Sequence, residues 1–150
     1  MEANAILVDC VSEVTDELVD VMRRLVPQLS SSAGAPSHSV LEEIVTSPVS
    51  TLIAARFSSR RETIVGTLTL ISYRIPSGLH AVIEDVVVDE SARGHGVGAA
   101  LVTEAVRLAR ERGALHVNLT SRSSREAANR LYKRAGFVER DTNVYRLDLR

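Results

Sequence analysis

Three glycines at alternate positions, Gly94, Gly96 and Gly98, follow Arg93 and precede an apolar run. Glycine lacks a side chain and takes positive φ readily, so successive backbone N–H groups can converge on one anion. A helix that starts directly behind the glycines adds further N–H donors and partial positive charge. The spacing therefore predicts a phosphate-binding loop at residues 93–98.

Two nucleotide-binding motifs share this glycine pattern. The P-loop ends in Gly-Lys-Ser/Thr, whereas two alanines follow Gly98. The dinucleotide fingerprint G-x-G-x-x-G/A matches Gly94, Gly96 and Ala99, but it should turn directly off its strand, and DESAR intervenes here. The chain also has HVNLTSR where that motif expects an acidic residue about 20 positions further on. A dinucleotide-dependent oxidoreductase is therefore a remote alternative.

Two acidic residues, Glu84 and Asp85, interrupt an otherwise apolar segment before the loop. Isolated acids are seldom placed in an apolar strand without a partner or a task. Side chains alternate along a strand, so the two point to opposite faces unless a bulge re-aims one of them. Glu84 is our candidate for a general base that acts through water.

Asn129 and Tyr132 are three residues apart in a segment with helical periodicity. Side chains at this spacing share one helix face, so both can reach the same ligand. Without further context, Tyr132 would be an ordinary amphipathic contact at a helix edge.

The surrounding sequence alternates between strand-like and helix-like segments. Apolar segments rich in Val, Ile and Thr predict strands, and apolar residues at helical spacing predict amphipathic helices. The expected strands span residues 5–11, 50–58, 62–74, 79–90, 114–120 and 142–149, and the expected helices begin near Thr15, Ser39, Val97 and Ser123, the last in capping-box spacing with Glu126. This order predicts one α/β domain over residues 1–150, with a mixed sheet and helices on both faces.

The composition is that of an ordinary globular protein, 45% hydrophobic and 25% charged, without a run long enough to span a membrane. Glu2 and Asp9 are atypical of a signal peptide, so we expect a cytoplasmic protein without membrane contact. Cys10 is the single cysteine, which excludes an internal disulfide and is typical of a small buried hydrophobic residue.

Charge is unevenly distributed along the chain. The net charge is −1, but residues 1–91 carry six arginines and thirteen acids, whereas residues 92–150 carry twelve basic and six acidic groups. A weakly negative chain is not expected to bind nucleic acid broadly. The local excess of arginine favours a small polyanionic ligand near the glycines.

The pattern Arg93-x-x-Gly96-x-Gly98 after the strand VIEDVVVDE resembles the pyrophosphate loop of the GNAT superfamily of acyl-CoA-dependent N-acyltransferases. NRLYKRAGF resembles that superfamily's second motif through Asn129, Tyr132 and Phe137, together with Leu131 and Gly136. The resemblance covers about the full chain and implies the GNAT fold, a six- to seven-stranded mixed sheet with about four helices.

The resemblance implies acetyl-CoA as the cosubstrate. Its diphosphate would lie on the backbone amides of the loop, where His95 would contribute mainly its amide. Its pantetheine arm would lie along the main chain of a bulged strand that splays from the next parallel strand. The implied binding residues are Val86, Val87, Val88, Arg93, Gly94, His95, Gly96, Val97, Gly98, Asn129 and Tyr132.

Direct acetyl transfer to a primary amine needs a neutral amine, a stabilised oxyanion and a proton for the departing thiolate. Tyr132 is the implied acid and Glu84 the candidate base. His38, His80 and His116 lack metal-ligand spacing, so no metal is expected. The acceptor is a small-molecule or peptide amine, and the resemblance is compatible with a homodimer. The main alternative is a non-catalytic module that binds or senses acyl-CoA.

Overall fold

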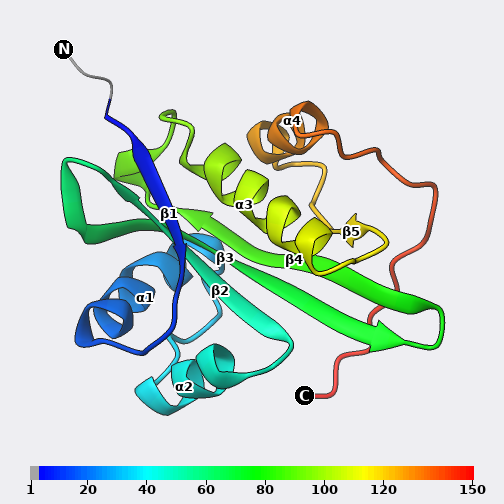
Figure 1. Ribbon diagram of the computed structural model, residues 1–150, viewed down its shortest axis with the longest axis horizontal. Helices are drawn as coiled ribbons and strands as arrows, with labels where there is room; N and C mark the ends of the chain where they lie inside the picture. The colour runs from blue at the N-terminus through cyan, green and yellow to red at the C-terminus, as the bar shows by residue number, and fades with distance from the viewer. Residues whose placement is uncertain (1–3) are drawn as a thin grey trace. The chain divides into compact units, whose positions relative to one another are not determined.

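The computed structural model describes residues 4–150, which divide into two compact units, with the boundary in the chain between Thr120 and Ser121. The first unit contains β1 (Ile6–Cys10), α1 (Asp16–Leu29), α2 (His38–Thr46), β2 (Ser50–Phe57), β3 (Arg60–Ile75), β4 (Gly78–Val88), the 3-10 turn η1 (Glu90–Ala92), α3 (Val97–Glu111) and β5 (Val117–Asn118). The second unit contains α4 (Glu126–Arg134). Figure 1 shows these elements along the chain.

The sheet has the order β1-β2-β3-β4-β5. Its first three pairings are antiparallel and the last, β4 with β5, is parallel. The strands expected at 50–58, 62–74 and 79–90 form an antiparallel meander, because the short turns after Phe57 and Ile75 return each strand beside its predecessor. The described sheet has five strands rather than the expected six or seven.

Helices cover both faces of the sheet in the first unit, α1 and α2 on one and α3 on the other (Figure 1). The first face buries Leu18, Val21, Met22 and Leu25 of α1, as the helical spacing predicts, together with Leu41 of α2. The core thus lies on either side of β2, β3 and β4 and fixes the strand from which the glycine loop departs.

Gly66 sets how closely α3 approaches β3. A Cβ atom at this position would lie 3.0 Å from Cγ1 of Val97 and 3.2 Å from Cδ1 of Leu101. Since both side chains belong to the first turns of α3 and are fully buried, they have little room to move aside. The missing side chain therefore lets the start of α3 pack directly on the sheet.

Helix termini follow local sequence signals in the first unit. Thr15 accepts a hydrogen bond from the backbone of Leu18, a cap that stabilises a helix by about 1 kcal/mol. Gly113, with φ 83°, follows the end of α3 as expected. The expected capping box at Ser123 and Glu126 is wrong: α4 begins at Glu126, and its N-cap, Arg125, makes no side-chain cap bond. Ser123 lies too far before this start to cap it.

The expected strand at residues 142–149 is wrong, because these residues form no regular secondary structure. Its apolar side chains are exposed, among them Val144, Tyr145, Leu147 and Leu149. An alternating pattern makes a strand only when a neighbouring strand accepts its backbone hydrogen bonds, and no such pairing forms within residues 4–150. The expected strand at 114–120 is likewise reduced to Val117–Asn118.

Candidate functional site

The glycine loop joins the end of β4 to the start of α3. Gly94 and Gly96 have φ values of 80° and 84°, a region that residues with side chains seldom adopt. The first backbone hydrogen bond of α3 runs from the N–H of Ala100 to the carbonyl of Gly96, 3.0 Å apart. The preceding amides of the first turn have no carbonyl within the helix to bind. The loop and the first turn of α3 therefore present main-chain donors in an arrangement that suits an anion.

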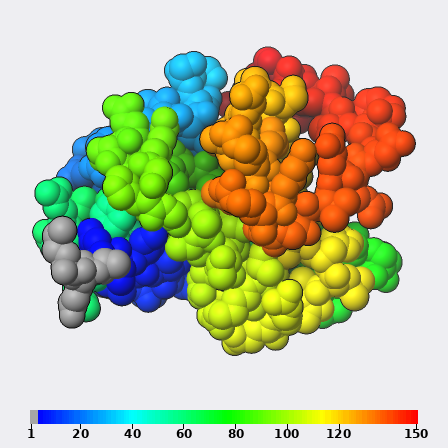
Figure 2. Space-filling view, turned by 90° about the horizontal axis from the view of Figure 1, so that it is seen from above, coloured from blue at the N-terminus to red at the C-terminus, as the bar shows by residue number. Residues whose placement is uncertain are grey.

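The side chains of the loop turn toward their own backbone. Arg93 donates from Nε to the carbonyl of Val88, 3.2 Å away. The ring of His95 lies 3.0 Å from the carbonyl of Arg93 through Nδ1 and packs edge-on against Phe57. Residues 93–96 are exposed, and Figure 2 shows this bright green segment on the molecular surface. The exposed surface of the loop thus includes its main chain.

Strand β4 contains the expected bulge. Thr67 pairs with Val87 and Thr69 pairs with Glu84, so β4 has one more residue than β3 between these two pairs. Asp85 lies at this bulge with φ 50°, the one positive value among the described residues other than glycine. Aspartate tolerates the left-handed region better than most residues.

The parallel pairing of β4 with β5 stops early. Only Ala81 and Val82 pair across, although β4 continues to Val88. Within the described chain no strand continues this pairing along residues 83–88, so no neighbouring strand covers this edge of β4, although Arg93 binds the carbonyl of Val88. The segment expected to contact pantetheine, Val86–Val88, lies on this edge.

Glu84 and Asp85 are both exposed, beside the unpaired edge of β4. The bulge breaks the simple alternation that would send them to opposite faces. The structure therefore brings both carboxylates close to the segment expected to hold the acyl group, and it does not by itself select one of them as a base.

Asn129 and Tyr132 belong to the second unit. The Asn129 side chain donates from Nδ2 to the carbonyl of Arg122, 2.9 Å away, across the turn before α4. Tyr132 is only 7% exposed, and its ring packs edge-on against that of Phe137 with 6.1 Å between the ring centroids. Burial raises the pKa of the Tyr132 phenol above its usual value, against a smaller opposing effect of Arg125. The phenol is therefore held in its proton-bearing form.

Two of the histidines contact each other. Nδ1 of His80 lies 2.9 Å from Nε2 of His116, and Ser77 binds the other nitrogen of His80. His38 begins α2 and is exposed. No group of three or more metal-ligating side chains occurs in the described part of the chain. His80 and His116 thus form a hydrogen-bonded pair at the surface.

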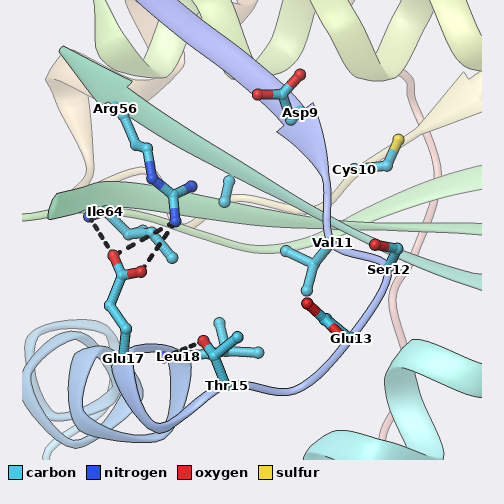
Figure 3. Close-up of a pocket in the computed structure, with 11 residues that line it drawn as sticks. Asp9, Cys10, Val11, Ser12, Glu13, Thr15, Glu17, Leu18, Arg56 and Ile64 are labelled. Atoms are coloured by element: carbon cyan, nitrogen blue, oxygen red, sulfur yellow. Dashed lines mark hydrogen bonds and ion pairs between the residues drawn. The ribbon is translucent and has the colours of Figure 1, made fainter. Parts of the chain in front are cut away.

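A pocket of about 180 Å³ lies at the opposite edge of the sheet (Figure 3). It lies beside β1 and the start of α1, and its polar lining includes Asp9, Glu13 and the ion pair of Glu17 with Arg56, 3.1 Å long. None of the residues that line this pocket belongs to β4, the glycine loop or α3, so the pocket shares no residue with the glycine-loop site. Sequence patterns gave no sign of it.

Cys10 also lines this pocket, and the expectation that it is buried is wrong. It lies at the end of the edge strand β1, where its residue is exposed. Partial desolvation and then the nearby Glu104 raise the pKa of its thiol. The thiol therefore carries little thiolate at neutral pH, which opposes a nucleophilic role.

Sequence reasoning missed Asp89, the residue at which the chain leaves β4. Its side chain is buried and accepts a hydrogen bond from the backbone of Ser91, 3.3 Å away, which caps η1. An acid that directly follows an apolar strand and precedes a glycine loop was the available signal.

The sequence model of the acetyltransferase (GNAT) family matches residues 18–137. The chain belongs to this family. The matched range contains the glycine loop, the bulged strand and α4, so both motifs quoted above fall within it. No helix of residues 4–150 combines the length and apolar character needed to cross a membrane.

An uncharacterized N-acetyltransferase of Methanocaldococcus jannaschii is 38% identical over 61 residues, which are 41% of this chain and 27% of that protein. The match thus spans about a quarter of the length of this curated relative. Among solved structures, a transcriptional regulator from Bacillus halodurans has 26% identity and a TM-score of 0.78, covering 97% of this chain and all of that chain.

An aminoglycoside acetyltransferase from an uncultured soil metagenomic sample, solved with trehalose, has 18% identity and a TM-score of 0.82. The similarity covers 97% of each chain. At this identity the likeness establishes a shared fold. The expected fold class, a mixed α/β GNAT fold, is therefore confirmed, with the strand count corrected as described above.

Proposed function

We propose that the chain transfers an acetyl group from acetyl-CoA to a primary amine by direct attack in a ternary complex. The observation that carries the proposal is the exposed loop with positive φ at Gly94 and Gly96, placed between a bulged β4 and the first turn of α3. Family membership supports acetyl transfer rather than dinucleotide chemistry at this loop.

Main-chain groups would provide most of the contacts to the cosubstrate. The amides from Gly94 to Gly98 suit a diphosphate, because residues 94–96 are exposed and the helix that begins at Val97 adds partial positive charge. Arg93 adds a full positive charge beside them. The unpaired edge of Val86–Val88 suits an extended pantetheine arm, which would bind it as a short parallel strand binds its neighbour. Asn129 would bind the pantetheine or diphosphate side.

Bound acetyl-CoA supplies an activated acetyl thioester. Glu84, through water, would take the proton that the amine loses as its nitrogen bonds to the acetyl carbon. An N–H group of Val86–Val88 would stabilise the negative charge that develops on the acetyl oxygen. Tyr132 would donate its phenolic proton to the sulfur as the carbon–sulfur bond breaks. The phenol carries its proton at neutral pH, which is the form that this role requires.

Thiol release from acetyl-CoA, measured across a panel of amines, tests the proposed activity. The panel includes polyamines, amino sugars, aminoglycosides and peptides, because the excess of acidic residues over residues 1–91 favours a cationic acceptor. Amine-dependent release supports the proposal. CoA binding without release for any amine supports the non-catalytic module instead, and tighter binding of NADH than of CoA restores the oxidoreductase alternative.

The choice of base is tested by a matched pair of substitutions on adjacent residues. Glu84→Gln is expected to lower kcat at neutral pH by about 100-fold, the lower end of the usual contribution of a general base. Asp85→Asn serves as its control at the same bulge. A larger loss in the Asp85 variant assigns the base to Asp85, and equal small losses assign proton removal to water alone.

We further propose that the acceptor is a small-molecule or peptide amine and that the protein is a cytoplasmic homodimer. The fold shared with an aminoglycoside acetyltransferase makes aminoglycosides one class to test. Size-exclusion chromatography with light scattering tests the dimer, and a mass equal to one 16.3 kDa chain at micromolar concentration contradicts it.

A further inference from the structure

Asp89 is the centre of a hydrogen-bond network that joins α1 to the beginning of the glycine loop. Its carboxylate accepts from Nε of Arg24 at 2.7 Å and from Nε2 of Gln28 at 3.5 Å, besides the backbone of Ser91. Arg24 and Gln28 are four residues apart in α1, so they project from the same helix face. One face of α1 thus binds the residue that directly follows β4.

The same two side chains also bind one backbone group each, in β3 and in η1. Arg24 donates from Nη2 to the carbonyl of Ile64 in β3, 3.1 Å away. Gln28 accepts through Oε1 from the N–H of Glu90, the first residue of η1, at 2.9 Å. Each side chain therefore links α1 both to Asp89 and to a second main-chain group.

The contacts of Asp89 determine where the loop begins. Its own N–H donates to the carbonyl of Val65, and its carbonyl accepts from the N–H of Ala92, each at 2.8 Å. Only this one-turn η1 lies between Asp89 and Arg93. Any displacement of Asp89 is therefore passed through a short, hydrogen-bonded turn to the positive-φ glycines.

Asp89 is held in its charged form, which strengthens its contact with Arg24. Burial by itself would raise the pKa of this carboxyl, but the hydrogen bonds from Arg24, Ser91 and Gln28 outweigh it and hold the pKa below the usual range. The carboxylate is thus ionised at neutral pH, and its contact with Arg24 is a charge-assisted hydrogen bond, which is about twice as strong as a neutral one.

We propose that Arg24, Gln28 and Asp89 are positioning residues that preset the glycine loop for the diphosphate of CoA. This inference rests on the proposed function, because it assigns the ligand of the loop to CoA. None of the three side chains needs to touch the ligand: they act by fixing the first residues of the loop. A preset loop loses little conformational freedom when it binds an anion, which strengthens binding.

Binding of CoA and of pantetheine, which has no diphosphate, tests this inference on the purified chain. Arg24→Gln is expected to weaken the Kd for CoA about 10-fold, the usual effect of losing a hydrogen bond to a charged group, measured by isothermal titration calorimetry. The Kd for pantetheine, measured by NMR titration, is expected to stay within twofold of wild type. Arg23→Gln is the matched control, since Arg23 is the preceding residue of α1 and pairs with Asp20 on the surface.

Two further variants separate positioning from loss of fold. Asp89→Asn retains an oxygen for the N–H of Ser91 but removes the charge paired with Arg24, and Gln28→Ala removes the link to Glu90 while leaving the ion pair. Both are expected to weaken CoA binding selectively. In the Arg24→Gln/Asp89→Asn double variant, the loss of CoA affinity should be smaller than the product of the two single losses, because both substitutions break the same contact.

The outcomes distinguish the network from the proposed function. A wild-type chain that binds no CoA overturns both. A wild-type chain that binds CoA, with variants that bind it equally well, overturns the network alone. Equal weakening of CoA and pantetheine, together with a lower Tm, shows a purely structural role and also overturns it.

Discussion

The glycine loop and helix α4 contain the two motifs of the family, and they are built in opposite ways. The proposed role of the loop depends on backbone conformation, with Gly94 and Gly96 at positive φ and the His95 ring against the carbonyl of Arg93. The proposed role of α4 depends on the side chains of Asn129 and Tyr132, which an ordinary helix carries. A change in the loop should therefore act through backbone strain, and a change in α4 through lost chemistry.

The difference separates binding from turnover. Main-chain amides can hold a diphosphate, but they do not exchange protons at neutral pH and cannot serve as the acid. A buried phenol with a raised pKa retains a proton that it can donate in the transition state. Substitutions in the two regions should therefore move different kinetic constants, and each prediction below tests that separation.

The largest effect is expected in α4. Tyr132→Phe should lower kcat by about 100-fold or more, as expected when a general acid is removed, and leave the Kd for CoA unchanged. Steady-state kinetics and calorimetry measure the two quantities. Tyr145→Phe is the control, because Tyr145 is 88% exposed and lies outside regular structure. An unchanged kcat in the Tyr132 variant removes the phenol from the reaction.

A smaller effect is expected in the loop, on the Kd for CoA rather than on kcat. Gly96→Ala should weaken the Kd for CoA about 10-fold, because a residue with a side chain at φ 84° costs about 1–2 kcal/mol. The added Cβ would lie 3.8 Å from Ile6, an ordinary contact, so backbone strain is the cause rather than a clash. Gly34→Ala is the control, since nothing lies within 4 Å of its added Cβ. Equal CoA binding in the Gly96 variant would show that the loop tolerates the strain.

Most strands that could be predicted from sequence have a partner that is adjacent in the chain. Strands β2, β3 and β4 are connected by short turns, so alternation and turn residues were sufficient to locate them. Strand β1 is the exception, because its apolar run was sufficient although α1 and α2 separate it from its partner β2. The segment 142–149 has equally good alternation but pairs with no strand of the described chain. Local pattern reports what a segment prefers, and pairing depends on which edge is available.

Site geometry was less predictable, for a related reason. The glycine loop was visible because its chemistry is local to six residues. The contact of Arg24 with Asp89 joins residues 65 positions apart, and nothing in the sequence around Asp89 identifies Arg24 as its partner. The positive φ of Asp85 likewise results from the register of β4 against β3, which no local pattern encodes.

A third prediction concerns charge at the base of the loop. The pKa of Asp89 is lowered in the folded chain, so its stabilising effect is fully present above the ordinary value of 3.8 and is lost as pH falls through the lower, folded-state pKa. Urea unfolding should show wild type more stable than Asp89→Asn at pH 7, with the difference shrinking below about pH 4. Asp20→Asn, on the exposed side of α1, is the control. A difference that does not change with pH would contradict a charged Asp89.

The smallest expected effect concerns the alkaline side of the pH profile of kcat/KM, where neither region is expected to reduce activity. Because burial raises the pKa of the Tyr132 phenol above its usual value, the phenol keeps its proton at neutral and mildly alkaline pH, and the loop amides do not titrate in that range. The kcat/KM for the amine should therefore rise with pH as the acceptor itself loses its proton, with no descending limb at mildly alkaline pH. A descending limb there that disappears in Tyr132→Phe would mean that the phenol ionises early. The environment of Tyr132 in the working enzyme would then stabilise the phenolate, and another group would have to protonate the sulfur.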